Sequence, residues 1–218
     1  AEGEAVPGLR ARLRTPLRWP VDARAGRISC VVPNWNYARY LLARLDSIAA
    51  QTVPLREVIL LDDASTDASV VVAEAIAEQF AWPMRLAANA RNGGNVVRQW
   101  RAGLELAEGE YVWIAEADDL AAPGFAAALQ AALDAAPDAP FAFCDSRVVD
   151  AAGAEVEADN KAYYARLGDA GLARSGSFPA AEFAARFLAP RNLELNASAV
   201  LWRRAALARV FAQLGEEA

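Results

Sequence analysis

The chain has 218 residues, 55% of them hydrophobic and 23% charged, and its formal net charge at pH 7 is −6. This composition is typical of one large globular domain with a buried core, and an acidic balance without a basic block argues against a nucleic-acid partner. The sequence contains no histidine, which excludes histidine-based triads, histidine general bases and histidine metal ligands. Cys30 and Cys144 lie in strand-like apolar runs, and we expect both to be buried, reduced thiols.

Residues 1–26 contain three prolines, several arginines and no steady hydrophobic period. This pattern predicts a linker or the end of a preceding domain, and we expect residues 27–218 to form the main domain. We find neither a signal peptide nor an apolar stretch long enough to cross a bilayer, so we expect a cytoplasmic protein.

Beyond residue 27, apolar runs of strand type alternate with segments of helical periodicity. The predicted strands are residues 28–32, 57–61, 84–87, 111–115, 141–146 and 197–202. The predicted helices are residues 38–51, 68–80, 97–107, 123–136, 180–188 and 204 onward. The alternation predicts an α/β fold with a mostly parallel central sheet covered by helices. Segment 154–178 is polar and weakly periodic, and we expect a long functional or mobile loop there.

Carboxylates gather where the predicted strand 111–115 ends, because Glu116, Asp118 and Asp119 follow its apolar run. In open α/β sheets, ligands bind outside the carboxyl ends of the strands. In an extended segment Glu116 and Asp118 point the same way, and two such oxygen ligands suit one hard cation. The alternative interpretation is a polar strand end or a helix cap.

Five short motifs follow one another along the chain. They are Pro33-Asn34-Trp35-Asn36, Asp62-Asp63-Ala64-Ser65-Thr66-Asp67, Asn92-Gly93-Gly94, Gly109-Glu110-Tyr111 and Glu116-Ala117-Asp118-Asp119. In this order they closely resemble family 2 glycosyltransferases over about residues 28–204. The last motif falls where that family carries its Asp-X-Asp motif, and its Glu-Ala-Asp-Asp form resembles one bacterial branch. The first motif is not the glycine-rich phosphate loop of an NAD-type Rossmann domain or of a nucleotidyltransferase.

The resemblance implies the GT-A fold, with a Rossmann-like nucleotide-binding half and a partial acceptor half. It also implies roles for individual side chains. The nucleotide would be bound by residues in the loops after the first strands and in the following helix: Pro33, Asn36, Asp62, Asp63 and Arg98. One or both aspartates would accept hydrogen bonds from the base or the ribose, although one of them would otherwise cap the next helix. Trp35 and Tyr37 would stack on the base, pack in the core or line the acceptor side.

Glu116 and Asp118 would, by the same resemblance, hold a divalent cation, Mn²⁺ or Mg²⁺, that bridges the two phosphates of the donor. Glu116 replaces the aspartate that is common in the family, so Asp118 is expected to bind directly and Glu116 through water. Asp119 would contact the sugar or the metal, or cap the next helix. Gln99 and Trp100 are assigned to packing, and Asn192 and Asn196 resemble the acceptor-side segment of the branch.

The activity implied is a metal-dependent, inverting hexosyltransferase that moves a sugar from a nucleotide-sugar, most commonly a UDP-sugar, to a glycan acceptor in bacterial surface polysaccharide synthesis. Other domains of a parent chain, and association with the inner membrane through them, are also expected. In this family the general base follows the last predicted helix, so we expect it beyond Ala218 and expect the chain alone to transfer sugar poorly. The alternative is a non-catalytic nucleotide-sugar-binding or scaffold module.

Overall fold

The computed structural model describes residues 25–80, 84–160, 164, 171–189 and 196–215. The described chain forms two compact units. The first runs up to residue 142 and resumes at residue 201, and the second comprises residues 143–200. Nearly all of the predicted linker, residues 1–24, lies outside the described residues.

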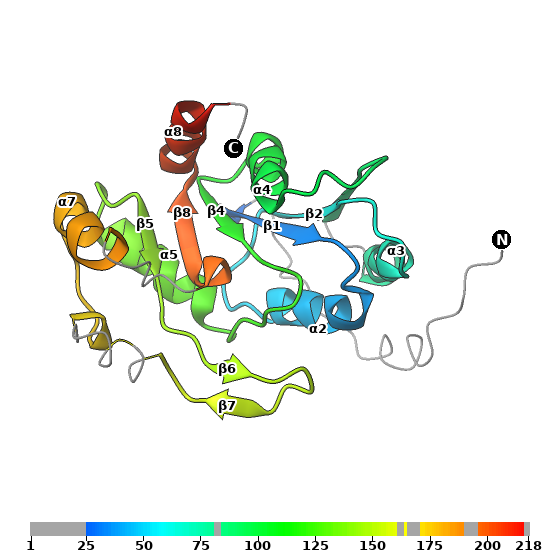
Figure 1. The fold of residues 1–218 in the computed structure, drawn as a ribbon, viewed down its shortest axis with the longest axis horizontal. Coiled ribbons are helices and arrows are strands. Elements are labelled where there is room, and N and C mark those ends of the chain that lie inside the picture. The colour runs from blue at the N-terminus through cyan, green and yellow to red at the C-terminus, as the bar shows by residue number, and fades with distance from the viewer. Residues whose placement is uncertain (1–24, 81–83, 161–163, 165–170, 190–195, 216–218) are drawn as a thin grey trace. The chain divides into compact units, whose positions relative to one another are not determined.

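Within the described residues, six strands form one sheet (Figure 1). In spatial order they are β3 (Met84–Ala88), β2 (Glu57–Asp62), β1 (Ile28–Asn34), β4 (Tyr111–Ile114), β8 (Val200–Arg203) and β5 (Phe141–Phe143). The pairs β1–β2, β2–β3 and β1–β4 are parallel, whereas β8 runs antiparallel to β4. The predicted α/β fold with a mostly parallel sheet is confirmed.

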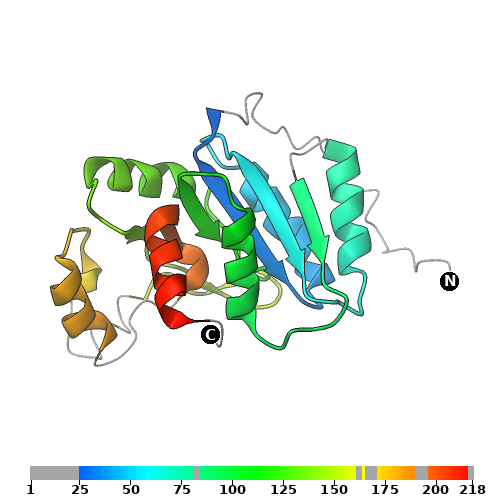
Figure 2. The ribbon, with the colours of Figure 1, turned by 90° about the horizontal axis from the view of Figure 1, so that it is seen from above.

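Helices cover both faces of this sheet. They are α2 (Ala38–Ala49), α3 (Ser69–Phe80), α4 (Val96–Leu106), α5 (Phe125–Ala135) and α8 (Arg204–Leu214). Cys30 and Val32 of β1 share a core cluster with α2, α3 and α5, whereas Val31 points to the other face and joins a cluster with α4 and α8. Figures 1 and 2 show α4 and α8 together on one side of the sheet and α2 on the other. Two covered faces explain why the middle residues of β1, Cys30–Pro33, and of β2, Val58–Leu61, are all apolar.

Strand β1 continues past Pro33, where the sequence pattern predicted its end. The carbonyl of Val31 accepts a bond from Ala115 on the β4 side, and the carbonyl of Asn34 accepts one from Asp63 on the β2 side. Alternation along the strand therefore places the nitrogen of Pro33 on the β4 side. Pairing with β4 ends at Val31 and Ile114, so a residue without an N–H interrupts no ladder there.

The second unit contains shorter elements. A two-stranded antiparallel sheet joins β6 (Val148–Val149) to β7 (Glu155–Glu157). It is followed by η2 (Gly171–Ala173), by α7 (Ala180–Phe183), which continues into the π-helical turn η3 (Ala184–Leu188), and by the 3₁₀ turn η4 (Ala197–Ala199). Part of the expected loop 154–178 is thus strand β7, which the sequence did not reveal because three residues are too few to show alternation.

Two further expectations need correction. Cys30 is fully buried as predicted, but Cys144 is exposed. The predicted strand 141–146 is shorter, and 197–202 begins as the turn η4 and becomes strand only at Val200. Among the described residues, none of the helices combines the length and the apolar character that a bilayer crossing requires.

Candidate functional site

The predicted site residues follow strands that end at one edge of the sheet. Because β1, β2, β3 and β4 are parallel, the loops after them emerge together, where α/β sheets bind their ligands. The loop after β1 and the loop after β2 are joined by side chains. Asn36 donates its backbone N–H to Ser65 Oγ at 2.8 Å, and its Oδ1 accepts from the backbone N–H of Thr66 at 2.7 Å.

Both of these loops contain a residue in the left-handed backbone region. Asn36 and Ala64 each have φ of +59°. Asparagine tolerates this conformation, whereas in alanine it is disfavoured by the Cβ. Backbone strain of this kind persists only where the surroundings hold it and is concentrated at functional sites. The two loops are therefore built to a fixed shape.

Asp62 is part of that fixed shape. It is 1% exposed, and its carboxylate accepts from the backbone N–H of Ser65 at 2.8 Å, from Ser65 Oγ at 2.6 Å and from Asn34 Nδ2 at 2.7 Å. A carboxylate offers about four lone-pair positions, so most of its capacity is used within the protein. The residue that caps the start of α3 is Asp67, which accepts from the backbone N–H of Ser69 at 2.9 Å.

Asp63 ties the loop after β3 to the start of α4. It is 5% exposed and accepts from Asn89 Nδ2 at 2.7 Å, from the backbone N–H of Gly93 at 3.0 Å and from Gln99 Nε2 at 2.9 Å. Direct contact of Asp62 or Asp63 with a nucleotide stays a prediction. What the geometry establishes is that both carboxylates hold the loops in which a nucleotide would lie.

The segment Glu116–Asp119 forms a turn, which we call the acidic turn. The backbone N–H of Asp119 donates to the carbonyl of Glu116 at 3.2 Å, and β4 has already ended at Ile114. The extended arrangement assumed from the sequence is therefore wrong. The chain leaves the sheet here because the ladder with β1 ends, and the side chains of Ala115 and Ala117 anchor the turn in the core.

Glu116 is held by the indole of Trp100, whose Nε1 donates to Oε1 at 2.7 Å. Burial raises the pKa of Glu116, the bond from Trp100 opposes this, and the charges of Asp118 and Asp119 raise the pKa further. The charge of Asp118 and a hydrogen bond to that carboxylate also raise the pKa of the Tyr37 phenol. The carboxylates of the acidic turn are thus close enough to repel one another, and a bound cation would relieve that repulsion.

The acidic turn offers the type of ligand that a hard cation prefers, but too few ligands for a complete metal site. The three acidic side chains of the turn, Glu116, Asp118 and Asp119, offer carboxylate oxygens, which suit Mg²⁺ or Mn²⁺. Within the part of the chain that the structure describes, no group of three or more such ligands is arranged to hold a metal ion. Binding of a cation by the turn therefore stays a prediction.

Comparison with known proteins decides the family. The model of glycosyl transferase family 2 matches residues 29–175, which include every loop described above. The chain belongs to this family.

Curated relatives are similar to the chain over less than half of its length. An uncharacterized glycosyltransferase of Nostoc is 37% identical over 99 residues, covering 44% of this chain and 30% of the relative. The glycosyltransferase GlyG of Streptococcus pneumoniae is 36% identical over 93 residues, covering 43% of this chain and 30% of the relative. The poly(ribitol-phosphate) β-N-acetylglucosaminyltransferase TarS of Staphylococcus aureus is 30% identical over 95 residues, covering 43% of this chain and 16% of TarS. The matched segment thus spans less than a third of each relative.

Solved structures confirm the GT-A fold. Residues 1–349 of S. aureus TarS in complex with UDP align with a TM-score of 0.59 at 20% identity, covering 84% of this chain and 48% of that one. The mannosyltransferase PcManGT of Pyrobaculum calidifontis in complex with GDP-Man and Mn²⁺ aligns with a TM-score of 0.61 at 23% identity, covering 93% of this chain and 52% of the other.

Three residues of the family 2 pattern lie outside the network of the loops. Pro33 is buried within β1, and Arg98 is exposed in the first turn of α4, whose N-terminus is capped by Asn95 through the backbone N–H of Val97. Trp35 is 52% exposed, so its indole is available to a ligand. Asn192 lies outside the described residues.

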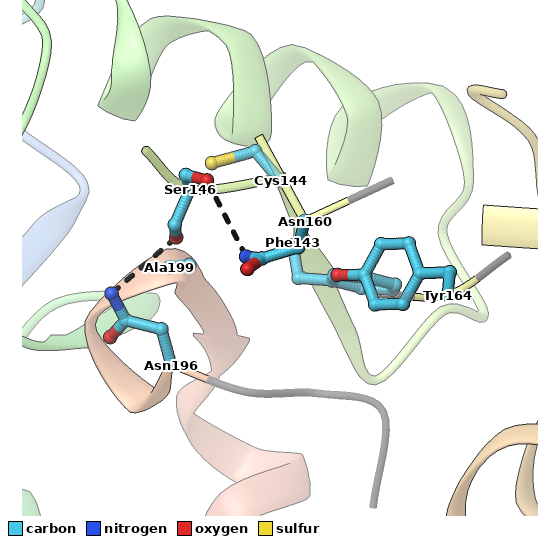
Figure 3. A pocket seen from close by; sticks show the side chains of 7 residues that line it. All are labelled: Phe143, Cys144, Ser146, Asn160, Tyr164, Asn196 and Ala199. Carbon is cyan, nitrogen blue, oxygen red and sulfur yellow. Dashed lines mark hydrogen bonds between the residues drawn. The ribbon is translucent and has the colours of Figure 1, made fainter. Parts of the chain in front are cut away.

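Asn196 belongs to a small cavity in the second unit (Figure 3). Its Nδ2 donates to Ser146 Oγ, and Asn160 Nδ2 donates to the carbonyl of Ser146, each at 3.4 Å. The cavity measures about 10 Å³, enough for roughly one water molecule. Its lining is Phe143, Cys144, Ser146, Asn160, Tyr164, Asn196 and Ala199.

Gln99 and Trp100 are the residues whose role the sequence interpretation missed. They were assigned to packing, yet each donates a hydrogen bond to a predicted site acid, Gln99 to Asp63 and Trp100 to Glu116. A polar atom on the buried face of an amphipathic helix was the available signal, since such atoms require a partner. The sequence pattern did not show which residue each of these polar atoms would bind.

Proposed function

We propose that this chain carries the donor site of an inverting, metal-dependent glycosyltransferase, and that its substrate is a nucleotide-sugar, most commonly a UDP-sugar. The acceptor would be a glycan or related polymer of the bacterial surface. The observation that carries the proposal is the acidic turn, which presents three carboxylates at the carboxyl edge of a parallel sheet in a family 2 domain.

Relatives support the acceptor class. TarS is named as a poly(ribitol-phosphate) N-acetylglucosaminyltransferase, and GgaB of Bacillus subtilis, 30% identical over 98 residues, as a minor teichoic acid biosynthesis protein. Both names concern surface polymers. Transfer of a hexose or N-acetylhexosamine unit to such a polymer is the activity we propose for the parent protein.

Glu116 and Asp118 would hold Mn²⁺ or Mg²⁺, and Asp119 would complete the metal shell or contact the sugar. The cation, when bound, stabilises negative charge on the departing diphosphate. The remaining contacts with the donor would come from residues of the chain itself. Asn36, Asp62 and Asp63 fix the loops that would receive the nucleoside, and Arg98 would approach the phosphates from the first turn of α4, where backbone N–H groups also favour an anion.

Calorimetric titration of the chain with UDP, GDP and dTDP, each with and without Mn²⁺, tests the proposal. We expect one nucleotide to bind in a Mn²⁺-dependent manner and Asp118→Asn to abolish the Mn²⁺ dependence. Asp138→Asn, at an exposed turn just after α5, is the matched control and should bind as the unaltered chain does. Binding to none of the three nucleotides would refute the donor site and favour a scaffold role.

A further inference from the structure

Arg44 is a buried cation that the proposed mechanism does not use. It lies on α2, is 0% exposed, and is among the largest fully buried side chains of the described structure. Arginine is almost never fully buried unless it is paired. Its guanidinium lies 4.9 Å from the ring centroid of Trp113 on β4, one residue before the strand ends.

The guanidinium lacks a hydrogen-bond partner in the part of the chain that the structure describes. Among the described residues, nothing accepts from Nε, Nη1 or Nη2 of Arg44. A desolvated cation without acceptors is costly, and the face of Trp113 offsets only part of that cost. Burial lowers the pKa of Arg44, but a guanidinium stays protonated in proteins. A fixed positive charge therefore lies in the core beside the end of β4.

Its charged neighbours belong to the acidic turn. Trp113, whose ring the guanidinium faces, precedes Glu116 by only three residues. The neighbouring Cys30 and the carboxylates of Asp119, Glu116 and Asp118 raise the pKa of Arg44 against the effect of burial. Arg44 in turn acts on Glu116. Because Arg44 is wholly buried, it cannot touch a ligand, and it would influence the turn through its field.

We propose that Arg44 is the built-in counter-charge of the donor site, a positioning residue whose buried guanidinium offsets part of the negative charge of the acidic turn so that an anionic diphosphate can approach it. This inference rests on the proposed function, because it assumes that the turn receives a diphosphate. It explains why an unpaired cation is retained in the core next to three carboxylates.

If the proposal holds, the charge of Arg44 affects the binding of a cation and the binding of an anion in opposite directions. A fixed positive charge attracts an approaching diphosphate and repels an approaching divalent cation, and burial protects it from screening by salt. Removing the charge should therefore tighten the binding of Mn²⁺ alone and weaken the binding of UDP to the chain that already holds Mn²⁺. A residue that only packs the core would weaken both when it is replaced.

The experiment compares Arg44→Met with Arg44→Lys in the full chain. Met keeps an unbranched apolar stem without the charge, and Lys keeps the charge. The probes are Mn²⁺ without nucleotide and UDP at a fixed, saturating Mn²⁺ concentration, each titrated calorimetrically at fixed ionic strength. For Arg44→Met we expect Mn²⁺ to bind roughly tenfold tighter and UDP roughly tenfold weaker, the smaller of the changes that a neighbouring charge imposes on a carboxylate. Arg44→Lys should stay within a few-fold of the unaltered chain.

Arg209→Met, at an exposed position of α8, is the matched control for loss of one positive charge and should change neither affinity. If Arg44→Met does not fold, as judged by its circular dichroism melt, Arg44→Gln makes the same charge change. Affinities that move in the same direction, or that do not move, overturn the inference and leave the donor site intact. An unaltered chain that binds neither probe overturns the donor site and the inference together.

Discussion

Gly103 is the position where the fold and the site can be disturbed by one methyl group. It lies in the middle of α4 and faces the sheet. A Cβ at this position would lie 2.2 Å from Val31 Cγ1, 3.0 Å from Val31 Cγ2 and 3.2 Å from Leu61 Cδ1. Ordinary contact begins at 3.4 Å, and Val31 is fully buried on a central strand. A β-branched side chain there has few rotamers into which it can retreat, so α4 itself must move.

Two opposing terms set the size of the effect of Gly103→Ala. Alanine in place of a helical glycine stabilises the helix by about 1 kcal/mol. Overpacking a close-packed core costs about 1–3 kcal/mol, and a 2.2 Å approach to a buried side chain belongs at the upper end. We expect Gly103→Ala to lower the free energy of unfolding by about 1–2 kcal/mol as the difference of these terms.

A double-mutant cycle with Val31→Ala identifies the cause. In the double variant, the Cβ introduced by Gly103→Ala would enter space that the valine side chain has vacated, so the two substitutions should be less than additive by about 1 kcal/mol or more. Urea unfolding followed by circular dichroism gives each free energy by linear extrapolation. An additive cycle, or a Gly103→Ala protein more stable than the unaltered chain, would show that α4 does not press on Val31.

Two further substitutions test the polar contacts. Trp100→Phe removes the indole N–H that donates to Glu116. We expect roughly tenfold weaker Mn²⁺ binding, since a hydrogen bond to a charged group contributes about 1.5–3 kcal/mol. The control Trp202→Phe should show no such loss, and unchanged Mn²⁺ affinity in Trp100→Phe would contradict the expectation. Asp67→Asn removes the carboxylate oxygen that accepts from the backbone N–H of Ala38 at 3.0 Å and should cost about 1 kcal/mol at pH 7. Partial burial works to raise the pKa of Asp67, but its hydrogen bonds outweigh this and lower the pKa. The carboxylate therefore stabilises the fold above its unfolded pKa, and the loss of stability in Asp67→Asn should vanish as the pH falls through the lowered folded pKa. A loss of stability that stays the same in urea unfolding from pH 7 to pH 3 would refute this assignment.

The sheet could be predicted from the sequence because its signal is local. The middle residues of β1 and β2 are all apolar, and helical periodicity between the two strands leaves a parallel crossover as the natural connection. A strand boundary could not be predicted where it depends on a contact that is distant in the sequence. Pro33 looked like a strand end, and only the departure of β4 at Ile114 makes a proline acceptable at that point.

The site could be predicted by residue type but not by arrangement. Carboxylates at strand ends pointed to a ligand edge, yet the assumption of an extended chain at Glu116 failed because the turn depends on where the ladder with β1 stops. The partners of Asp63 lie 26 to 36 positions away in the sequence, and no periodicity relates them. The burial of the Arg44 guanidinium, without a hydrogen-bond partner among the described residues, could likewise not be predicted, since an arginine on an amphipathic helix is normally a solvated one.

Helix α4 connects core packing to the site. Gln99 and Trp100 precede Gly103 by four and three positions, so all three lie on one face of the helix. The absence of a side chain at Gly103 lets that face approach β1 and β2 closely. The same approach brings the amide of Gln99 to Asp63 and the indole of Trp100 to Glu116. A helix displaced by a larger residue at this position would lengthen both bonds together, so Gly103→Ala should weaken Mn²⁺ binding in the same step in which it lowers stability. If Mn²⁺ affinity were unchanged in that variant while stability fell, the two acids would not depend on the seating of α4.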